Sequence, residues 1–222
     1  MKSGKFICLT GIDGAGKTTL ASLVVDAMNK NDTKAMYIYN RYIPFLAKPA
    51  IWLAGVLLLR NKDIYVSYHE YSSSKRTASS SHPFLAEAYQ YLLIFDYLIQ
   101  IFAKITIPLA LGKTVICDRY IYDTLATDLA IDFNYTDDKL EYTLKRFLNL
   151  CPVPDLTFLI DIPEEVAMSR KTDVPSMDYL KERRRFYLIL ADILPDVIIL
   201  NGCKNPDDLK VAVLESFGGK TS

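Results

Sequence analysis

The chain has 222 residues, and half of them are hydrophobic. That is enough to bury one large core, so we expect a single domain over residues 1–222. Twenty-six basic residues balance 26 acidic ones, which excludes the strong positive field that draws proteins to nucleic acid, and we expect no nucleic-acid partner.

The four cysteines are widely separated, and only two histidines could join them as metal ligands. This pattern is typical of reduced, buried thiols in a cytosolic protein rather than of disulfides or a zinc site. No charged and then apolar leader precedes the first hydrophobic run. We therefore expect no secretory signal and a cytoplasmic location.

Apolar runs typical of strands alternate along the chain with stretches of helical composition, which predicts a parallel sheet covered on both faces. The predicted strands are short and mostly rich in branched or aromatic residues: Phe6–Leu9, Ala35–Tyr39, Thr114–Cys117, Leu156–Ile160 and Val197–Leu200. Helices are expected over Lys17–Asn29, Pro44–Leu59, Pro83–Leu111, Tyr122–Ala130, Asp137–Leu150, Pro163–Arg170, Met177–Ile193 and Asp207–Phe217. The fold class is therefore α/β, with a five-stranded parallel sheet.

The segment Phe45–Leu59 is apolar except for Lys48. It is shorter than the roughly 20 apolar residues that cross a bilayer, so we expect no membrane span. A helix in the core or in a dimer interface is the first interpretation, and an exposed patch that meets another partner is the alternative. The apolar stretch Ile101–Leu111 is also expected in the core. Residues 60–82 are polar and serine-rich, and they are the best candidate for a flexible loop over a site.

The phosphate loop, Gly11–Thr18, reads G-I-D-G-A-G-K-T and matches the pattern G-x-x-x-x-G-K-[ST]. A buried strand precedes it and a helix follows, so the context predicts a three-layer P-loop NTPase fold that binds a nucleoside triphosphate. We assign nucleotide binding to Gly11, Asp13, Gly14, Ala15, Gly16, Lys17, Thr18 and Thr19. The alternative is a glycine turn that binds nothing.

Two residue types of this loop carry the expected chemistry. Lys17 would reach the β- and γ-phosphates of the nucleotide as a point charge, and the Thr18 hydroxyl would hold Mg²⁺ against the same oxygens. Asp118, at the carboxyl end of a predicted strand, would orient that metal or a water bound to it. The motif thus predicts a nucleoside triphosphate with Mg²⁺, and Thr18 and Asp118 on the metal.

Several arginines follow predicted strands and would converge on the phosphate loop. Arg41 follows the second strand, Arg119 follows the third, and Arg170 closes a helix after the fourth. Such cations are what transfer between two phosphate-bearing substrates requires, because the transition state spreads negative charge over the transferred group. Each could instead hold the fold or lie in solvent: Arg119 could pair with Asp118 or a helix carboxylate, and the run 181–185 could be an exposed helix face.

Taken together, the chain resembles the thymidylate kinase family. The resemblance extends over most of its length, through GIDGAGKTTL, the arginine after the second strand, a long helix ending in glycine, VICDRY, PDLTFLIDIPEEV and RRRFYLILA. It implies a five-stranded parallel sheet, transfer of the γ-phosphate of ATP to the nucleotide dTMP with Mg²⁺, and a homodimer.

The resemblance also implies roles for individual residues. Asp13 would meet the sugar hydroxyl of the acceptor, and Arg41 and Arg119 would hold its phosphate. A catalytic arginine comes in this family either from the phosphate loop or from the lid after the fourth strand. Ala15 occupies the loop position here, so the lid, residues 170–179, would supply it, with Arg170 as first choice and Arg184 as second.

Other positions depart from the family pattern. Counting back from Gly112 and Asp118 without gaps, Tyr97 stands where a base-reading arginine is expected, and Leu93 replaces the phenylalanine that stacks on thymine. After the D-R-Y motif the family usually shows a small residue, then alanine, an aromatic and glutamine, and the chain shows Asp123, Ala126, Thr127 and Asp128, so all but the alanine differ. Tyr42 replaces an acidic residue, and the lid is several residues short. Because a site that hydrogen-bonds a base edge discriminates strongly, these changes bear on the acceptor.

Two alternatives remain open at this stage. The same scaffold could phosphorylate another nucleotide, a nucleoside or a different small phosphorylated metabolite; a nucleoside would need a carboxylate base, for which Asp13 is the candidate. A protein of another class, a nucleotide-binding switch or assembly module, could use the apolar segment Phe45–Leu59 to engage a partner.

Overall fold

The computed structural model describes residues 4–45, 48, 83–171, 173–194 and 196–219. The predicted loop over residues 60–82 and nearly all of the apolar segment 45–59 lie outside the described residues. The predictions made for both segments therefore stay predictions.

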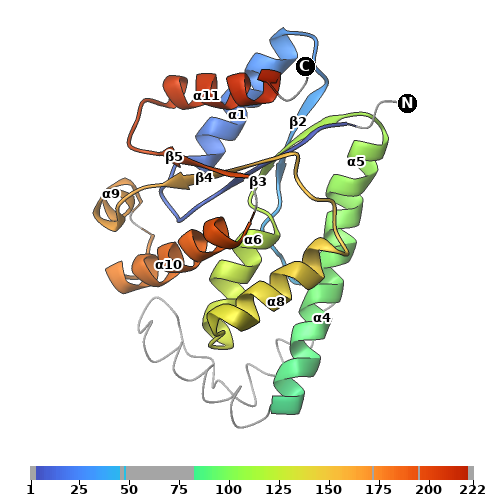
Figure 1. Cartoon of the computed structure of the whole chain (residues 1–222), viewed down its shortest axis with the longest axis vertical. Helices are drawn as coiled ribbons and strands as arrows, with labels where there is room; N and C mark the ends of the chain where they lie inside the picture. Colours follow the sequence, from blue (N-terminus) through green and yellow to red (C-terminus); the bar gives the residue numbers. More distant parts are fainter. Residues whose placement is uncertain (1–3, 46–47, 49–82, 172, 195, 220–222) are drawn as a thin grey trace.

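The five predicted strands form one sheet (Figure 1), in the order β2-β3-β1-β4-β5. They are β1 (Phe6–Thr10), β2 (Ala35–Tyr39), β3 (Thr114–Asp118), β4 (Leu156–Asp161) and β5 (Val197–Asn201). All neighbouring pairs are parallel. Every residue of β1 and β3 is buried, as expected for strands that are covered on both faces, so the predicted fold class is confirmed.

Helices connect the strands and cover both faces. They are α1 (Lys17–Lys30), α4 (Pro83–Ile101), α5 (Ile107–Ala110), α6 (Ile121–Asp123), α7 (Ala130–Asp132), α8 (Asp137–Leu148), α9 (Glu164–Arg170), α10 (Met177–Ile193) and α11 (Pro206–Gly219), with widened π-helical turns η2 (Phe102–Thr106) and η3 (Thr124–Leu129). Figure 1 shows α1 and α11 together on one face of the sheet and α6, α8 and α10 on the other. This is the three-layer arrangement that the alternating pattern predicts.

The helix predicted over Pro83–Leu111 is present as α4, η2 and α5 in succession. Pro108 has no backbone N–H and its ring would clash with the carbonyl of residue 104, and the widened turn η2 lies just where that clash would occur. Gly112 ends the helix with a left-handed φ of 77°, which glycine adopts without strain.

Only one side of this long helix is in the core, which corrects the prediction for Ile101–Leu111. Ile101 and Ile105 are buried, whereas Phe102 and Leu111 are 60% and 65% exposed. Ile101 and Ile105 are four residues apart and share the buried face, whereas Phe102 lies about 100° further round the helix and Leu111 lies at its end.

Candidate active site

The phosphate loop has a backbone that only glycine tolerates at two of its positions. Gly11 and Gly14 have φ values of 137° and 83°. A Cβ atom would lie 2.4 Å from the Ile160 carbonyl oxygen at Gly11 and 2.7 Å from the Ala167 carbonyl oxygen at Gly14. Both contacts are with backbone atoms of β4 and α9, so these glycines let the loop lie directly against the neighbouring segments.

Lys17 lies inside this loop with its side chain folded back. Its Nζ donates hydrogen bonds of 2.7 Å to the carbonyl oxygens of Gly11 and Ile12, and the residue is only 4% exposed. Burial lowers the pKa of Lys17 from its usual 10.5 to about 8, and the nearby Arg119 adds to this effect. The ammonium is therefore held in a site where an anion would stabilise its charge.

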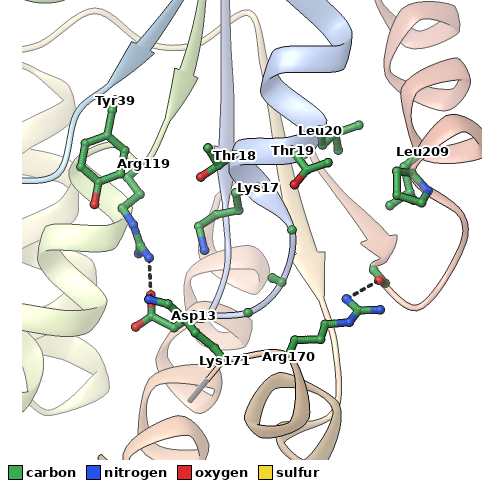
Figure 2. Close-up of a pocket in the computed structure, with 15 residues that line it drawn as sticks. Asp13, Lys17, Thr18, Thr19, Leu20, Tyr39, Arg119, Arg170, Lys171 and Leu209 are labelled. Carbon is green, nitrogen blue, oxygen red and sulfur yellow. Dashed lines mark hydrogen bonds and ion pairs between the residues drawn. The ribbon is translucent and has the colours of Figure 1, made fainter. Parts of the chain in front are cut away.

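A cavity of about 630 Å³ opens over the loop (Figure 2), within the size range of small-molecule sites. The residues around it come from the phosphate loop, the strand ends, the lid and the start of α11: Asp13, Gly14, Ala15, Gly16, Lys17, Thr18, Thr19, Leu20, Tyr39, Arg119, Arg170, Lys171, Gly202, Pro206 and Leu209. Most of the predicted nucleotide-binding residues thus share one cavity. Gly11, Arg41, Asp118 and Arg184 are not among its lining residues.

Asp118 lies behind Thr18 at the end of β3. Its Oδ2 accepts hydrogen bonds from the Thr18 hydroxyl at 2.5 Å and from the Tyr37 hydroxyl at 3.1 Å. The carboxylate is fully buried, and its other oxygen, Oδ1, has no hydrogen-bond partner among the described residues. A buried carboxylate oxygen left open beside a threonine hydroxyl is a donor set that suits Mg²⁺.

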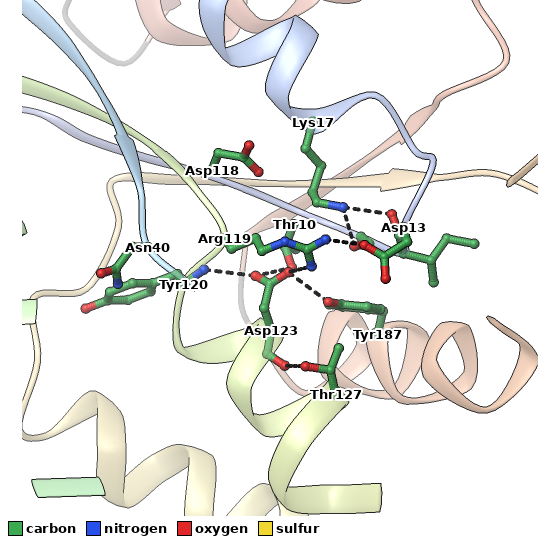
Figure 3. A network of polar contacts seen from close by, with 12 residues as sticks. Thr10, Asp13, Lys17, Asn40, Asp118, Arg119, Tyr120, Asp123, Thr127 and Tyr187 are labelled. Carbon is green, nitrogen blue, oxygen red and sulfur yellow. Dashed lines mark hydrogen bonds and ion pairs between the residues drawn. The ribbon is translucent and has the colours of Figure 1, made fainter. Parts of the chain in front are cut away.

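Arg119 bridges two carboxylates (Figure 3). Its Nη2 lies 2.5 Å from Asp13 Oδ1 and its Nη1 lies 3.1 Å from Asp123 Oδ1. The residue has a left-handed backbone, with φ at 73°, which costs a non-glycine residue about 1 kcal/mol or more and persists only where the surroundings enforce it. Arg119 does pair with a helix carboxylate, Asp123, yet it also lines the cavity.

Positive charge gathers around Asp13. Burial alone would raise the pKa of the Asp13 carboxyl, but neighbouring cations lower it to about 2. These cations are Arg119, Lys17, Lys171 and Arg41, in order of decreasing effect. Four cations from four different segments therefore face one point beside the phosphate loop.

Arg41 belongs to this group although it does not line the cavity. It is half-buried after β2. Burial works against its charge, yet Asp128 raises the pKa of the Arg41 guanidinium above its usual value. Its charge acts on Asp13, Asp128 and Arg119, which favours a role beside the site over the alternative of a solvated loop residue.

Arg170 and Arg184, the two residues expected to supply the catalytic arginine, both bind other groups of the protein in the structure. Arg170 donates from Nη1 to the Gly202 carbonyl oxygen at 3.0 Å, and Figure 2 shows its side chain directed toward Leu209 and away from Lys17. Arg184 makes a bidentate pair with Asp161, at 2.7 and 2.8 Å, and a further bond of 3.2 Å with Glu164. Its fork is thus occupied by the end of β4 and the start of α9.

Comparison with known proteins gives a consistent assignment. The sequence model of the family described as thymidylate kinase matches residues 73–207. The chain is 30% identical over 216 residues to a probable thymidylate kinase of Pyrococcus horikoshii, with 93% of this chain and 92% of the relative covered. The chain belongs to the thymidylate kinase family.

Similar relatives come from both archaea and bacteria. A probable thymidylate kinase of Methanosarcina acetivorans is 27% identical over 221 residues, covering 96% of this chain and 95% of the relative. A thymidylate kinase of Kosmotoga olearia is 26% identical over 229 residues, covering 96% and 94%. The predicted resemblance to the thymidylate kinase family is confirmed.

The two departures predicted on α4 lie in the core. Tyr97 is 1% exposed, and its hydroxyl donates to the Asn40 carbonyl oxygen at 2.9 Å while it accepts from Asn40 Nδ2 at 3.0 Å. Leu93 is 9% exposed and packs in the same core. At these two positions this thymidylate kinase family member packs α4 against the fold and links it to the end of β2.

Sequence reasoning missed several residues of the site. The sequence pattern favours Arg170 over its neighbour Lys171, yet Lys171 also lines the cavity, with its Nζ 3.8 Å from Asp13 Oδ1. Asp123 was noted only as a departure, and its contact with Arg119 could have been suspected from the i, i+4 spacing. Nothing in the sequence singles out Tyr37, a tyrosine on an edge strand.

Proposed function

We propose that this protein transfers the γ-phosphoryl group of ATP to dTMP. The observation that carries the proposal is that Arg119, Lys17 and Lys171 line one cavity with Asp13 beside a phosphate-binding loop, with Arg119 and Lys171 paired to Asp13. The charge of Arg41 adds to theirs at Asp13. One cation suffices to hold ATP, whereas several on the acceptor side suit a second phosphate-bearing substrate and the charge of the transition state. As a member of the thymidylate kinase family, the chain is an ATP-dependent nucleotide kinase.

In this proposal the phosphate loop holds the triphosphate of ATP. Its backbone N–H groups, at the start of α1, cradle the phosphates. Lys17 leaves the carbonyl oxygens of Gly11 and Ile12 and moves to the β- and γ-phosphates. Since Lys17 is buried and partly stripped of water, its charge acts strongly on the group in transfer.

Thr18 and Asp118 would hold Mg²⁺ through the Thr18 hydroxyl and the open Asp118 Oδ1. An ion held there would supply positive charge beside the phosphates of ATP. Within the described residues no group of three or more acidic, histidine or cysteine side chains could hold a metal on its own. That agrees with an ion held jointly by protein and nucleotide phosphates.

The electrostatics of Asp13 favour a phosphate acceptor over a nucleoside. A nucleoside kinase needs a base that removes a proton from an alcohol. With its pKa at about 2 and Arg119 at 2.5 Å, Asp13 is a poor proton acceptor at neutral pH. A monophosphate is already anionic at that pH and needs no base, so we assign Asp13 to the acceptor's sugar hydroxyl as a hydrogen-bond acceptor.

We assign the two lid cations to different ends of ATP. Arg170 and Gly202 flank the cavity near Pro206 and Leu209, which suits stacking on the adenine. Lys171 lies on the Asp13 side with its side chain 43% exposed, and its ion pairs with the described residues Asp13 and Asp173 are long, at 3.8 and 3.4 Å. Because it can move at little cost, we propose Lys171, rather than Arg170 or Arg184, as the lid cation that reaches the transferred phosphoryl group.

Variants separate these two lid roles. Lys171→Met should lower kcat by about a hundredfold, with ATP affinity nearly unchanged, as expected when a transition-state contact is lost. Arg170→Met, which removes the neighbouring cation, should raise KM for ATP and leave kcat within about threefold. The reverse pattern would return the catalytic role to Arg170.

The exposed side of α4 supports a homodimer, which we include in the proposal. The α4 stripe is an apolar row on α4 that continues into η2, is 44% to 80% exposed and recurs at helical spacing: Phe84, Tyr91, Phe95, Ile99 and Phe102. Among the described residues, Glu87–Ala110 is the one helix long and apolar enough to cross a membrane, by length and composition alone. We assign its apolar face to a second copy of this chain, in keeping with a single-domain protein that acts in the cytoplasm.

The proposal is tested by measuring ADP release from Mg-ATP with dTMP, dUMP, the other nucleoside monophosphates, thymidine and deoxycytidine. We expect dTMP to be preferred. Because Leu93 and Tyr97 are in the core, a preference for another monophosphate is the second candidate outcome on the same scaffold. Activity with nucleosides alone would contradict the role of Asp13. ATP hydrolysis that no acceptor accelerates would favour a nucleotide-binding switch.

A further inference from the structure

Two carboxylates pair with Arg119, and side chains of α10 hydrogen-bond to both of them. The two carboxylates each accept a hydrogen bond from a tyrosine of this helix. Tyr187 donates to Asp123 Oδ1 at 2.7 Å, and Tyr179 donates to Asp13 Oδ2 at 3.3 Å. We call Asp13, Asp123, Tyr179 and Tyr187 the arginine frame (Figure 3 shows most of it).

The two carboxylates of the frame are not equivalent. Asp123 is 1% exposed, and both of its oxygens accept two hydrogen bonds. Oδ1 accepts from Arg119 and Tyr187, and Oδ2 accepts from the Thr10 hydroxyl at 3.0 Å and the Tyr120 backbone N–H at 2.9 Å. A carboxylate with every acceptor position filled has no freedom to rotate or to take another partner.

Asp13, in contrast, lies on the wall of the cavity. Its side chain is 11% exposed, and besides Arg119 it faces Lys171 at 3.8 Å. A phosphate that enters the cavity can compete with Asp13 for these cations. It cannot compete with Asp123 for Arg119 in the same way, because Asp123 is not among the residues that line the cavity. The ion pair of Arg119 with Asp13 is therefore exchangeable, and the ion pair with Asp123 is permanent.

We propose that Asp123 and Tyr187 are positioning residues that anchor Arg119 through Nη1 and leave its Nη2 to pass from Asp13 to the phosphate of the acceptor. The inference rests on the proposed function. Arg119 then keeps one counter-charge at all times, so its buried guanidinium never lies unpaired while the acceptor enters or leaves. Although burial works against its charge, Asp123 leads the groups that raise the pKa of Arg119 well above its usual range.

Helix α10 fixes the distance between the two tyrosines. Tyr179, Arg183 and Tyr187 follow one another at intervals of four residues, on one face of the helix. Arg183 lies between them, with its guanidinium 3.5 Å from the centre of the Tyr179 ring and its Nη2 donating to the Thr127 carbonyl oxygen at 3.2 Å. The frame thus ties the orientation of Arg119 to the position of α10.

The test uses variants that remove single hydrogen bonds. Tyr187→Phe deletes only the hydroxyl on Asp123, and Asp123→Asn keeps the shape but removes the charge. We expect Tyr187→Phe to raise both KM and the calorimetric Kd for dTMP by about fivefold and Asp123→Asn by more than tenfold, with the Kd for ATP within twofold. Tyr120→Phe is the control, because Tyr120 is as buried a residue as Tyr187 and its hydroxyl donates at 2.8 Å to the Pro152 carbonyl oxygen instead of to a partner of Arg119.

A double-mutant cycle shows whether Tyr187 acts through Arg119. In an Arg119→Ala background, Tyr187→Phe should change dTMP binding by less than about twofold. The inference is overturned if Tyr187→Phe lowers only the melting temperature, if it weakens ATP and dTMP binding equally, or if its effect is the same without Arg119. Tyr187→Phe decides the matter even where Asp123→Asn does not fold.

The same measurements distinguish failure of the proposed function from failure of the role assigned to Asp123 and Tyr187. Wild-type protein that transfers phosphate to no monophosphate contradicts the function itself. Wild-type protein that is active, with variants that leave the dTMP parameters unchanged, contradicts only the role of Asp123 and Tyr187.

Discussion

Raising the pH from 7 to 9 should weaken ATP binding about tenfold, because Lys17 loses its proton in the ligand-free protein over this range. The pKa of Lys17 is about 8 in the free protein, and the triphosphate of ATP favours the charged form and raises that pKa in the complex. Below pH 8 Lys17 is mostly protonated already, so ATP binding requires little proton uptake. Above pH 8 binding must take up a proton, so the affinity falls as the pH rises.

The magnitude follows from the charged fraction of Lys17 in the free protein. With a pKa of about 8, that fraction is roughly 0.9 at pH 7 and roughly 0.1 at pH 9, a loss of about 1.4 kcal/mol in binding free energy. Proton uptake on binding should be about 0.5 per ATP at pH 8. The phosphates themselves lose their last proton near pH 6, so their charge is constant over the upper part of the range.

Calorimetric titration with Mg-ATP in the absence of acceptor measures both quantities, in buffers of different ionisation enthalpy. The matched control is Lys17→Arg, because a guanidinium stays protonated throughout and its profile should be flat whatever its absolute affinity. An ATP affinity that does not change between pH 7 and 9, with no proton uptake, would refute the burial argument for Lys17.

Three further predictions follow from single contacts. Gly14→Ala introduces a Cβ 2.7 Å from the Ala167 carbonyl oxygen at a φ of 83°. It should lower the free energy of unfolding, measured by urea titration, by about 1–3 kcal/mol and should abolish ATP binding. A variant as stable as the wild type would contradict the described loop. Tyr37→Phe removes the 3.1 Å hydrogen bond to Asp118. It should weaken Mn²⁺ binding to the ATP complex severalfold, measured by paramagnetic resonance, and leave the ATP affinity in EDTA unchanged. A variant that binds Mn²⁺ as tightly as the wild type would exclude Tyr37 from metal positioning. Phe95→Asp and Phe102→Asp, on residues 57% and 60% exposed, should convert a dimer to a monomer in sedimentation, and a monomeric wild type would refute the dimer.

The architecture was predictable because each element carries a local signal. The five strands were found within one residue of their observed ends, since buried parallel strands are short apolar runs between turns. Helix α10 was predicted with the bounds Met177–Ile193 that it has. The phosphate loop was also predictable, because its glycines and Lys17 occupy fixed offsets between a strand and a helix.

The partners of the arginines were not predictable to the same degree. Arg170, Lys171 and Arg184 are all basic and near one another in the sequence, yet they face Gly202, Asp13 and Asp161 respectively. These differences arise from side-chain direction at the end of α9 and on α10, which composition and spacing do not encode.

The acceptor side was the hardest to read for the same reason. Asp123 and Tyr187 are 64 residues apart in the sequence and meet only because α6 and α10 pack together. The change from a small residue to Asp123 was visible in the sequence, but its meaning depends on Arg119, Tyr187, Thr10 and the Tyr120 backbone being around it.

Transfer of label from the γ-phosphate of ATP to dTMP tests the central claim most directly. The account predicts that the wild-type protein with Mg²⁺ forms labelled dTDP, that Lys17→Ala forms none, and that Arg119→Ala needs far more dTMP while binding ATP almost normally. Label that appears only as free phosphate, or equal loss of ATP and dTMP use in Arg119→Ala, would contradict it.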